Sequence, residues 1–256
     1  MMAADNSVHL RRVAKRYRGH TVLSEINLRL SSGEVTAILG ANGCGKSTLL
    51  RIAAGITAPS QGRVLGRPRS VGYLPDRFPA QLRLSASSYL RSMGALHARE
   101  PDARVEKPRA QMLLLDQLRF TGDSSAPMST LSKGNAQKVG LVQALCGGSG
   151  LIVLDEPWSG LDPAVAPVLA QQLIDRARAG AAVLVTDHTG LSESLPGHRL
   201  RMAEGRLTPE QITQQPGPRG DPRAELTTIT IEVPRHRREE ILNTVRAMGG
   251  RPLGPR

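Results

Sequence analysis

The chain has 256 residues, enough to bury a substantial core in one large domain or in one domain with a small appendage. Its two cysteines lie far apart and it has no run of 18 apolar residues, which argues against a disulfide framework and against a membrane-spanning chain. The net charge of +12 favours an anionic partner, such as nucleic acid, a nucleotide or an anionic membrane surface, without choosing among them.

The first third of the chain predicts short strands followed by a helix. Apolar alternation predicts strands at 8–17 and 22–30, and the apolar run VTAIL predicts a buried strand at 35–39. A glycine-rich turn then leads into a helical pattern at 47–54. The Pro-, Gly- and Arg-rich stretch 57–72 predicts a loop or short hairpin that ends in the strand-like VGYL.

The middle of the chain alternates helical patterns with short apolar runs. Helical spacing at 85–118 predicts a small helical insert, and another helical pattern covers 138–145. Apolar runs at 151–154 and 181–185 have the length of strands, and the helical stretch 165–179 separates them. This order predicts a buried parallel sheet in an α/β domain.

The end of the chain predicts a linker and a small appendage. The linker contains QITQQPGPRGDPR, and a strand and an amphipathic helix follow it. One strand and one helix cannot form an independent core, so we expect them to dock on the main body or on another chain. The predicted division is a main domain at 1–208 with its helical insert at about 77–130, a linker at 209–225 and an appendage at 226–256.

The segment GANGCGKST matches the phosphate-loop pattern G-x-x-x-x-G-K-[ST], with a predicted strand before it and a helix after it. Its glycines let backbone N–H groups turn toward anionic phosphates, its lysine adds a charge at the β and γ phosphates, and its serine hydroxyl suits Mg²⁺. The candidate nucleotide contacts are Gly40, Asn42, Gly43, Gly45, Lys46, Ser47 and Thr48.

Acidic residues follow one buried strand, and a histidine follows the next. Asp155 is placed to hold Mg²⁺, and Glu156 to orient or deprotonate an attacking water. Alone, this Asp-Glu pair is more often a strand that ends in solvated acids; paired with the phosphate loop, it favours catalysis. His188 is placed to reach the γ-phosphate from the end of the next predicted strand.

These motifs, together with LSKGNAQ at 131–137, resemble the nucleotide-binding subunit of ATP-binding-cassette (ABC) transporters over about residues 8–207. The resemblance implies that Lys46, Glu156 and His188 are catalytic and that Ser47 and Asp155 bind Mg²⁺. It also implies that Tyr17 stacks on adenine, although a strand-edge tyrosine can instead fill a core.

LSKGNAQ occupies the place of the family's signature motif, usually LSGGQ. The resemblance implies that Ser132 and Gly134 donate hydrogen bonds to the γ-phosphate held by the other subunit, from the N-terminus of a helix. Four residues depart from the family pattern, among them Trp158, which stands at a position that is often threonine and has no expected mechanistic role. Lys133 and Asn135 replace a glycine and the glutamine of the motif, and Asp76 stands at the Q-loop glutamine, where it could contact Mg²⁺ or its water.

The expected fold is a P-loop NTPase of the ABC ATPase type, an α/β fold with an antiparallel β subdomain, a RecA-like core and a helical subdomain. The expected cofactors are ATP and Mg²⁺. The expected partners are a second nucleotide-binding subunit, in a homo- or heterodimer, and a separate permease. The chain is therefore expected in the cytoplasm, peripheral to the inner face of the cell membrane. The LSKGN and YLPDRF variants favour an exporter.

Two other functions compete with transport. A soluble cassette acting on nucleic acid or ribosomes would suit the net charge, but such ribosomal proteins usually carry two cassettes and this chain has one, so nucleic acid is not the expected partner. A non-hydrolysing regulatory or assembly module is the third possibility. The presence of Lys46, Asp155, Glu156 and His188 argues against an inactive site.

Overall fold

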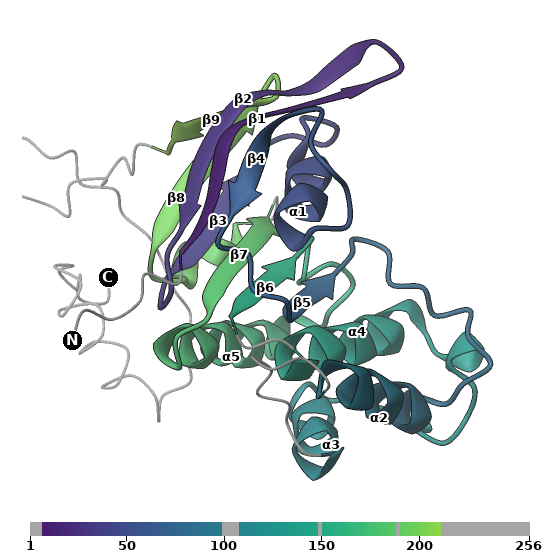
Figure 1. The fold of residues 1–256 in the computed structure, drawn as a ribbon. Coiled ribbons are helices and arrows are strands. Elements are labelled where there is room, and N and C mark those ends of the chain that lie inside the picture. The colour runs from purple at the N-terminus through teal and green to yellow at the C-terminus, as the bar shows by residue number, and fades with distance from the viewer. Residues whose placement is uncertain (1–6, 99–107, 148–149, 188–189, 211–256) are drawn as a thin grey trace, which may run out of the picture. The chain divides into compact units, whose positions relative to one another are not determined.

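Two β-sheets and a set of helices make up the part of the chain that the structure describes (Figure 1). This computed structural model describes residues 7–98, 108–147, 150–187 and 190–210, which all belong to one compact unit, Met1–Gln211. None of the helices in those ranges is long and apolar enough to cross a lipid bilayer. The predicted appendage at 226–256 lies outside the described residues, as does most of the linker before it.

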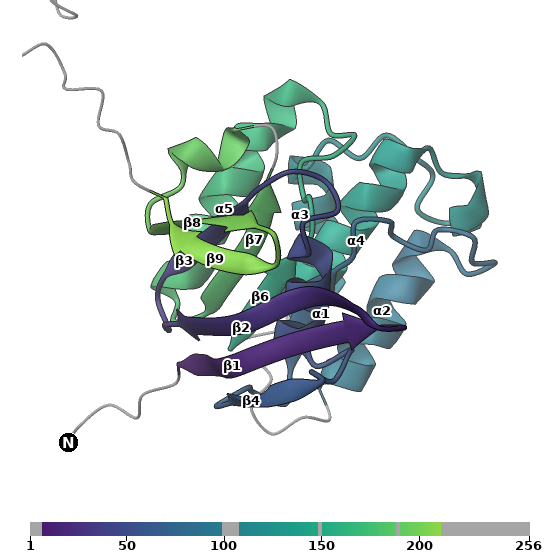
Figure 2. The same ribbon diagram turned by 90° about the horizontal axis from the view of Figure 1, so that it is seen from above.

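The first sheet has three antiparallel strands in the order β2-β1-β4 (Figure 2). They are β1 (Val8–Tyr17), β2 (His20–Leu30) and β4 (Gln61–Leu65). The prediction of a loop or short hairpin at 57–72 is wrong for β4, which pairs with the distant β1. Because β4 is almost fully exposed, its sequence lacks the apolar alternation that would have revealed it.

The second sheet has six strands in the order β5-β6-β7-β3-β8-β9. The first five are parallel, and β9 is antiparallel to β8. This confirms the predicted buried parallel sheet. Leu151 and Val153 face one core while Ile152 and Leu154 face the other, which explains the uninterrupted apolar run. The strands are β3 (Val35–Leu39), β5 (Val71–Leu74), β6 (Leu151–Leu154), β7 (Ala182–Asp187), β8 (His198–Ala203) and β9 (Arg206–Pro209).

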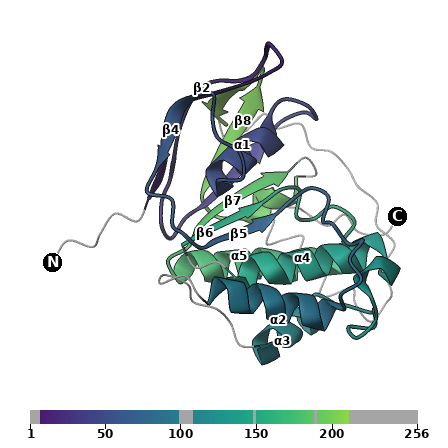
Figure 3. The ribbon, with the colours of Figure 1, turned by 45° about the vertical axis from the view of Figure 1, so that its right-hand side comes forward.

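Helices cover both faces of the six-stranded sheet (Figure 3). Helix α1 (Lys46–Ala54) lies between the two sheets and packs on both, whereas α4 (Lys133–Gly147) and α5 (Ala166–Arg178) cover the opposite face. The predicted helical insert contains α2 (Ala86–His97) and α3 (Pro108–Gln117), which pack against α4. Three short 3-10 turns complete the described elements: Met128–Thr130, Pro163–Val165 and Leu191–Ser194.

Candidate active site

The candidate catalytic residues gather at the carboxyl edge of the six-stranded sheet. Strands β3, β7 and β6 are parallel neighbours, so the segments that follow β3 and β6 and the last residues of β7 meet at the same edge. The phosphate loop follows β3, Asp155 and Glu156 follow β6, and Thr186 is the penultimate residue of β7.

The phosphate loop requires glycine at both of its ends. A Cβ atom at Gly40 would lie 2.4 Å from the carbonyl oxygen of Met202, and one at Gly45 would lie 2.9 Å from that of Val22. Gly45 also has a φ of 112° where it caps the start of α1. Between these two points, Asn42 is exposed to solvent. The loop is therefore held by neighbouring strands at its ends and open in the middle, as phosphate binding by backbone N–H groups needs.

Lys46 lies inside this loop, and only 6% of its side chain is exposed. Its Nζ donates hydrogen bonds to the carbonyl oxygens of Gly40 at 2.7 Å and Ala41 at 3.2 Å. The same Nζ lies 3.7 Å from Oε1 of Glu156. The lysine charge thus stands between the loop and a candidate catalytic carboxylate.

Asp155 is fully buried at the end of β6. Its Oδ1 accepts a hydrogen bond of 2.8 Å from the Thr186 hydroxyl, whereas Oδ2 is buried without a hydrogen-bond partner among the described residues. Burial raises the pKa of this carboxyl group, and the nearby Ser47 and Thr186 hydroxyls oppose that shift. The negative charge of Asp76 raises the pKa of Asp155 further, which places Asp76 within electrostatic reach.

This donor set fits Mg²⁺. The cation prefers oxygen ligands and usually keeps several waters, so it needs only one or two protein groups. A buried carboxylate oxygen without a partner beside the Ser47 hydroxyl offers such groups, and the exposed Asp76 is close enough to affect a bound ion or its water.

Glu156 follows directly and is held by its backbone. Its φ of 51° is unusual for a residue with a side chain, its N–H donates to the Thr186 hydroxyl at 2.8 Å, and its carbonyl accepts from Gln137 Nε2 at 3.5 Å. These contacts fix the peptide while the carboxylate faces Lys46. The geometry suits a carboxylate that must stay in one position beside a phosphate site.

Sequence reasoning missed the part played by Thr186. One hydroxyl donates to Asp155 and accepts from the N–H of Glu156, so it fixes both acidic residues. The sequence signal that could have pointed to Thr186 is its position in VLVTD, where a polar residue stands near the end of an otherwise apolar strand. Arg51 was missed as well: from α1 it hydrogen-bonds the Tyr73 side chain, and its charge lowers the pKa of Asp155.

The signature segment 131–137 leads into α4, which begins at Lys133, five residues before the helical pattern predicted at 138–145. Ser132 is exposed and caps the helix, its Oγ accepting from the N–H of Asn135 at 3.2 Å. A Cβ atom at Gly134 would lie 2.8 Å from the carbonyl oxygen of Gly160, so this glycine lets the helix approach residues 159–162, which stand at the place of the family's D-loop. Among the described residues, neither Ser132 nor Gly134 forms a hydrogen bond with Lys46 of the same chain.

The residues that depart from the family pattern have different surroundings. Asn135 is buried and exchanges 3.3 Å hydrogen bonds with Thr121, whereas the exposed Lys133 lies near Gly160. Trp158, which had no expected mechanistic role, is 5% exposed and packs in the core that covers the α4 and α5 face of the sheet. Asn135 and Trp158 thus serve packing in this chain.

Two predicted site residues lie away from this cluster or outside the described residues. Tyr17 ends β1, is 42% exposed, and has Lys15 Nζ 4.8 Å from its ring centroid. Its ring is therefore accessible for stacking. His188 lies outside the described residues; the preceding Asp187 is buried and accepts a 2.6 Å hydrogen bond from the N–H of Ser192.

Comparison with known proteins decides the family. The family model described as "ABC transporter" matches residues 23–159. The chain belongs to the ABC transporter family. This confirms the α/β P-loop NTPase fold expected from the resemblance, with the three-stranded sheet as the antiparallel β subdomain, the six-stranded sheet as the RecA-like core, and α2 and α3 in the helical subdomain.

Relatives with curated names are ABC ATP-binding proteins. The chain is 30% identical over 239 residues to "Aliphatic sulfonates import ATP-binding protein SsuB" of Rhodopseudomonas palustris, covering 88% of this chain and 80% of the relative. It is 33% identical over 189 residues to "Zinc import ATP-binding protein ZnuC" of Pseudomonas fluorescens, covering 72% and 69%. Both relatives are named for import, so their names give no support to the exporter expectation.

Solved structures agree with this membership. A structure described as the ATP-binding subunit of an ABC transporter superposes with a TM-score of 0.70 at 25% identity, over 78% of this chain and 87% of that one. A dimeric bacterial ABC transporter cassette superposes with a TM-score of 0.69 at 22% identity, over 78% and 96%, and supports the fold alone.

Proposed function

We propose that this ABC protein is the ATP-hydrolysing subunit of an importer whose membrane-spanning permease is a separate chain. The observation that carries the proposal is the convergence of Lys46, Asp155 and Glu156 at one sheet edge. The proposed direction of transport, into the cell, is supported by the relatives named for import. In such a system the chain would lie at the cytoplasmic face of the membrane, attached through the permease.

The phosphate loop and Lys46 would bind the triphosphate of ATP. Loop N–H groups between Gly40 and Thr48 would face the phosphates, and Lys46 would exchange its contacts with the loop carbonyls for contacts with phosphate oxygens. Ser47 and Asp155 would hold Mg²⁺, with Asp76 near its water. When bound, Mg²⁺ would neutralise part of the negative charge of the phosphates.

Glu156 would act as the general base. Before the phosphates bind, its carboxylate lies 3.7 Å from Lys46 Nζ. Transfer of Lys46 to the phosphates frees the carboxylate to orient a water molecule and take its proton, while Thr186 keeps the Glu156 backbone fixed. His188 is proposed to contact the γ-phosphate, and Tyr17 to stack on adenine.

Ser132 and Gly134 are proposed to complete the ATP site of a second nucleotide-binding subunit. Both lie at the start of a 15-residue helix, where the helix dipole favours an anion. Mixed dimers of Ser132→Arg and Lys46→Ala subunits test this arrangement, because only action in trans leaves one intact site. Nucleotide trapping in a Glu156→Gln background should exceed that of either parent homodimer; equal trapping would contradict the trans assignment.

Transport direction can be tested with the full chain and its permease in proteoliposomes. An alkanesulfonate and Zn²⁺ are the first cargoes to try, because the relatives are named for them. An importer moves cargo toward the side on which the ATP-binding subunit and ATP are present, and Lys46→Ala should stop that movement. Movement of cargo to the opposite side would contradict the proposal.

The C-terminal appendage at 226–256 is proposed to be dispensable for ATP hydrolysis. Strand β9 ends at Pro209, and Glu210 forms an ion pair with Arg201 of β8, so a truncation after Glu210 keeps the sheet edge complete. We expect the truncated protein to retain ATP hydrolysis while its dimerisation or regulation changes. Failure of the truncated protein to bind ATP would show that the appendage belongs to the ATPase domain.

A further inference from the structure

The three-stranded sheet has an apolar inner face and a basic outer face. Its inner side chains, such as Leu10 and Ile26, pack against α1 residues in one core. The outer side carries a hollow of about 720 Å³, called here the arginine hollow, which is lined by Arg11, Arg12, Asn27, Gly62 and Arg63. It opens on the side of the sheet away from α1, and hence away from the phosphate loop.

A β-bulge in β1 brings two consecutive arginines to the arginine hollow. Strand residues normally alternate between faces, but Arg12 has a φ of 48°, and the register shifts here in both pairings of β1. The Arg12 N–H donates to Asn27 Oδ1 at 2.9 Å. A Cβ atom at Gly62 would lie 2.2 Å from the Arg12 carbonyl oxygen, so the bulge fits only against glycine. Three separate strands thus build this basic concavity.

The arginines of the hollow have no acidic partner in the described part of the chain. Arg11 and Arg63 are directly opposite each other on neighbouring strands, and no ion pair there involves either of them or Arg12. Like charges in facing positions destabilise a sheet. Packing gives no compensation, because all three residues are exposed.

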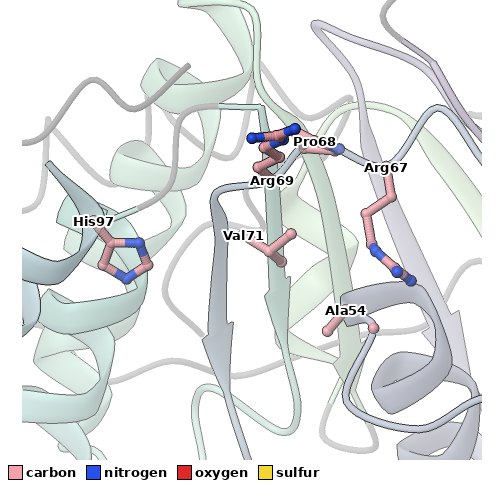
Figure 4. Close-up of a pocket in the computed structure, with 7 residues that line it drawn as sticks. Ala54, Arg67, Pro68, Arg69, Val71 and His97 are labelled. Atoms are coloured by element: carbon pink, nitrogen blue, oxygen red, sulfur yellow. The ribbon is translucent and has the colours of Figure 1, made fainter. Parts of the chain in front are cut away.

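A second basic hollow in the same chain provides a contrast. It measures about 550 Å³, and its lining includes Arg67, Arg69 and His97 (Figure 4). There, Arg67 Nη1 donates to the carbonyl oxygen of Ile52 at 3.4 Å, near the carboxyl end of α1. His97 Nδ1 lies 3.2 Å from the Ser70 hydroxyl. These contacts give Arg67 and His97 structural roles. The guanidinium groups of the arginine hollow form no hydrogen bond or ion pair within the part of the chain that the structure describes.

We propose that the arginine hollow binds a small phosphate-bearing polyanion, at a site separate from the ATP site. Each guanidinium group presents parallel N–H donors that match two oxygens of a phosphate, and three such groups from neighbouring strands suit an anion with several charges. The volume lies within the range of small-molecule pockets, about 300–1,000 Å³. The same chemistry occurs in lipid headgroups, but the concave shape favours a free molecule.

Inorganic pyrophosphate is the probe for this site. Calorimetric titration is done with the full chain in a Lys46→Ala background, which removes the phosphate-loop lysine as a competing contact. Saturable binding with one site per chain is expected. Adding Arg11→Gln and Arg63→Gln should weaken it by at least about tenfold, since each removes a charge-assisted contact. Arg11→Lys with Arg63→Lys keeps the positive charges but removes the paired N–H donors of each guanidinium group. The affinity for pyrophosphate should therefore fall several-fold.

The matched control is Arg69→Gln with Arg109→Gln, which removes the same charge from exposed positions elsewhere. It should leave pyrophosphate affinity within about threefold, because general attraction alone is weak at moderate salt. Absence of saturable binding, or equal weakening by both double variants, would overturn the proposal. Binding to phosphatidylglycerol vesicles that depends on Arg11 and Arg63, without pyrophosphate binding, would also overturn it in favour of a lipid surface. Circular dichroism confirms that each variant is folded.

Discussion

The carboxyl edge of the six-stranded sheet and the arginine hollow differ in how their charged side chains are paired and solvated. At the sheet edge, Lys46 and Glu156 are largely buried and lie close together, and Thr186 joins Asp155 to the Glu156 backbone. In the arginine hollow, exposed cations face each other without an acid among the described residues. A buried charge needs a partner inside the protein, because it has lost its hydration. An exposed charge is solvated by water and can remain unpaired until a ligand binds.

The largest expected effect comes from Glu156→Gln. It should lower the turnover of ATP by at least about a hundredfold, the scale of a lost general base, while ATP binding is retained. Phosphate release and equilibrium ATP binding measure the two quantities. Lys46→Ala is the comparison, because it should weaken ATP binding itself. Near-normal hydrolysis by Glu156→Gln would remove this residue from the catalytic role.

Removing the hydroxyl that joins the two acids should have the next largest effect. Thr186→Val leaves the Glu156 N–H and Asp155 Oδ1 without their shared partner, so the free energy of unfolding should fall by about 1–3 kcal/mol. The turnover should also fall, because Glu156 loses its backbone support. Urea unfolding and phosphate release are the measurements. Thr186→Ser keeps the hydroxyl and should behave like the original; equal behaviour of the Val and Ser variants would contradict the role of the hydroxyl.

Asp155→Asn should stabilise the nucleotide-free protein at neutral pH by about 1 kcal/mol, the usual scale of a single substitution. Burial raises the folded-state pKa of Asp155, so its favourable contribution to folding is fully present below the unfolded pKa and is lost as pH rises through the folded pKa. The advantage of the Asn variant should therefore grow with pH and vanish in acid. Thermal unfolding with a chelator present, from pH 4 to 8, measures it. A pH-independent difference would rule out this explanation.

The smallest expected effect is that of Arg63→Gln in the arginine hollow. Removing one of two facing cations should stabilise the ligand-free fold by about 0.2–1 kcal/mol at low salt. Because exposed charges are screened, the gain should shrink in about 1 M salt and stay constant between pH 5 and 8. Urea unfolding at two salt concentrations checks this, with Arg69→Gln as the control. A loss of stability at low salt would show that Arg63 has a partner that its surroundings do not indicate.

Strong local patterns made most of the core, and the residues of the candidate phosphate loop, predictable from sequence. VTAIL, VGYL and the run at 151–154 coincide with β3, β5 and β6. In β3 and β6 nearly every residue is buried, which favours a continuous, mostly apolar run. The exposed β4, as well as β8 and β9, carry weaker patterns and were not predicted as strands. Their places depend on pairing with strands far away in the chain.

Contacts between distant residues also explain what sequence reasoning could not predict in the site. The phosphate loop is a continuous motif, so its residues could be named in advance. The hydroxyl of Thr186 acts on residues about 30 positions away, and a bulge matched to Gly62 creates the arginine hollow. Neither feature corresponds to a local sequence motif. Both could be recognised only once the pairing and register of the strands were known.

Trp158 gives the protein an intrinsic fluorescence signal from a single position. It is the single tryptophan of the chain, it is buried, and it stands two residues after Glu156. Its backbone carbonyl accepts a 3.1 Å hydrogen bond from the N–H of Leu161 in the D-loop, and its indole packs in the core beneath. The residue therefore lies where the proposed catalytic carboxylate and that loop meet. Fluorescence from this one residue can therefore follow nucleotide binding, subunit closure and phosphate release in real time, without a label and with no second emitter of its kind.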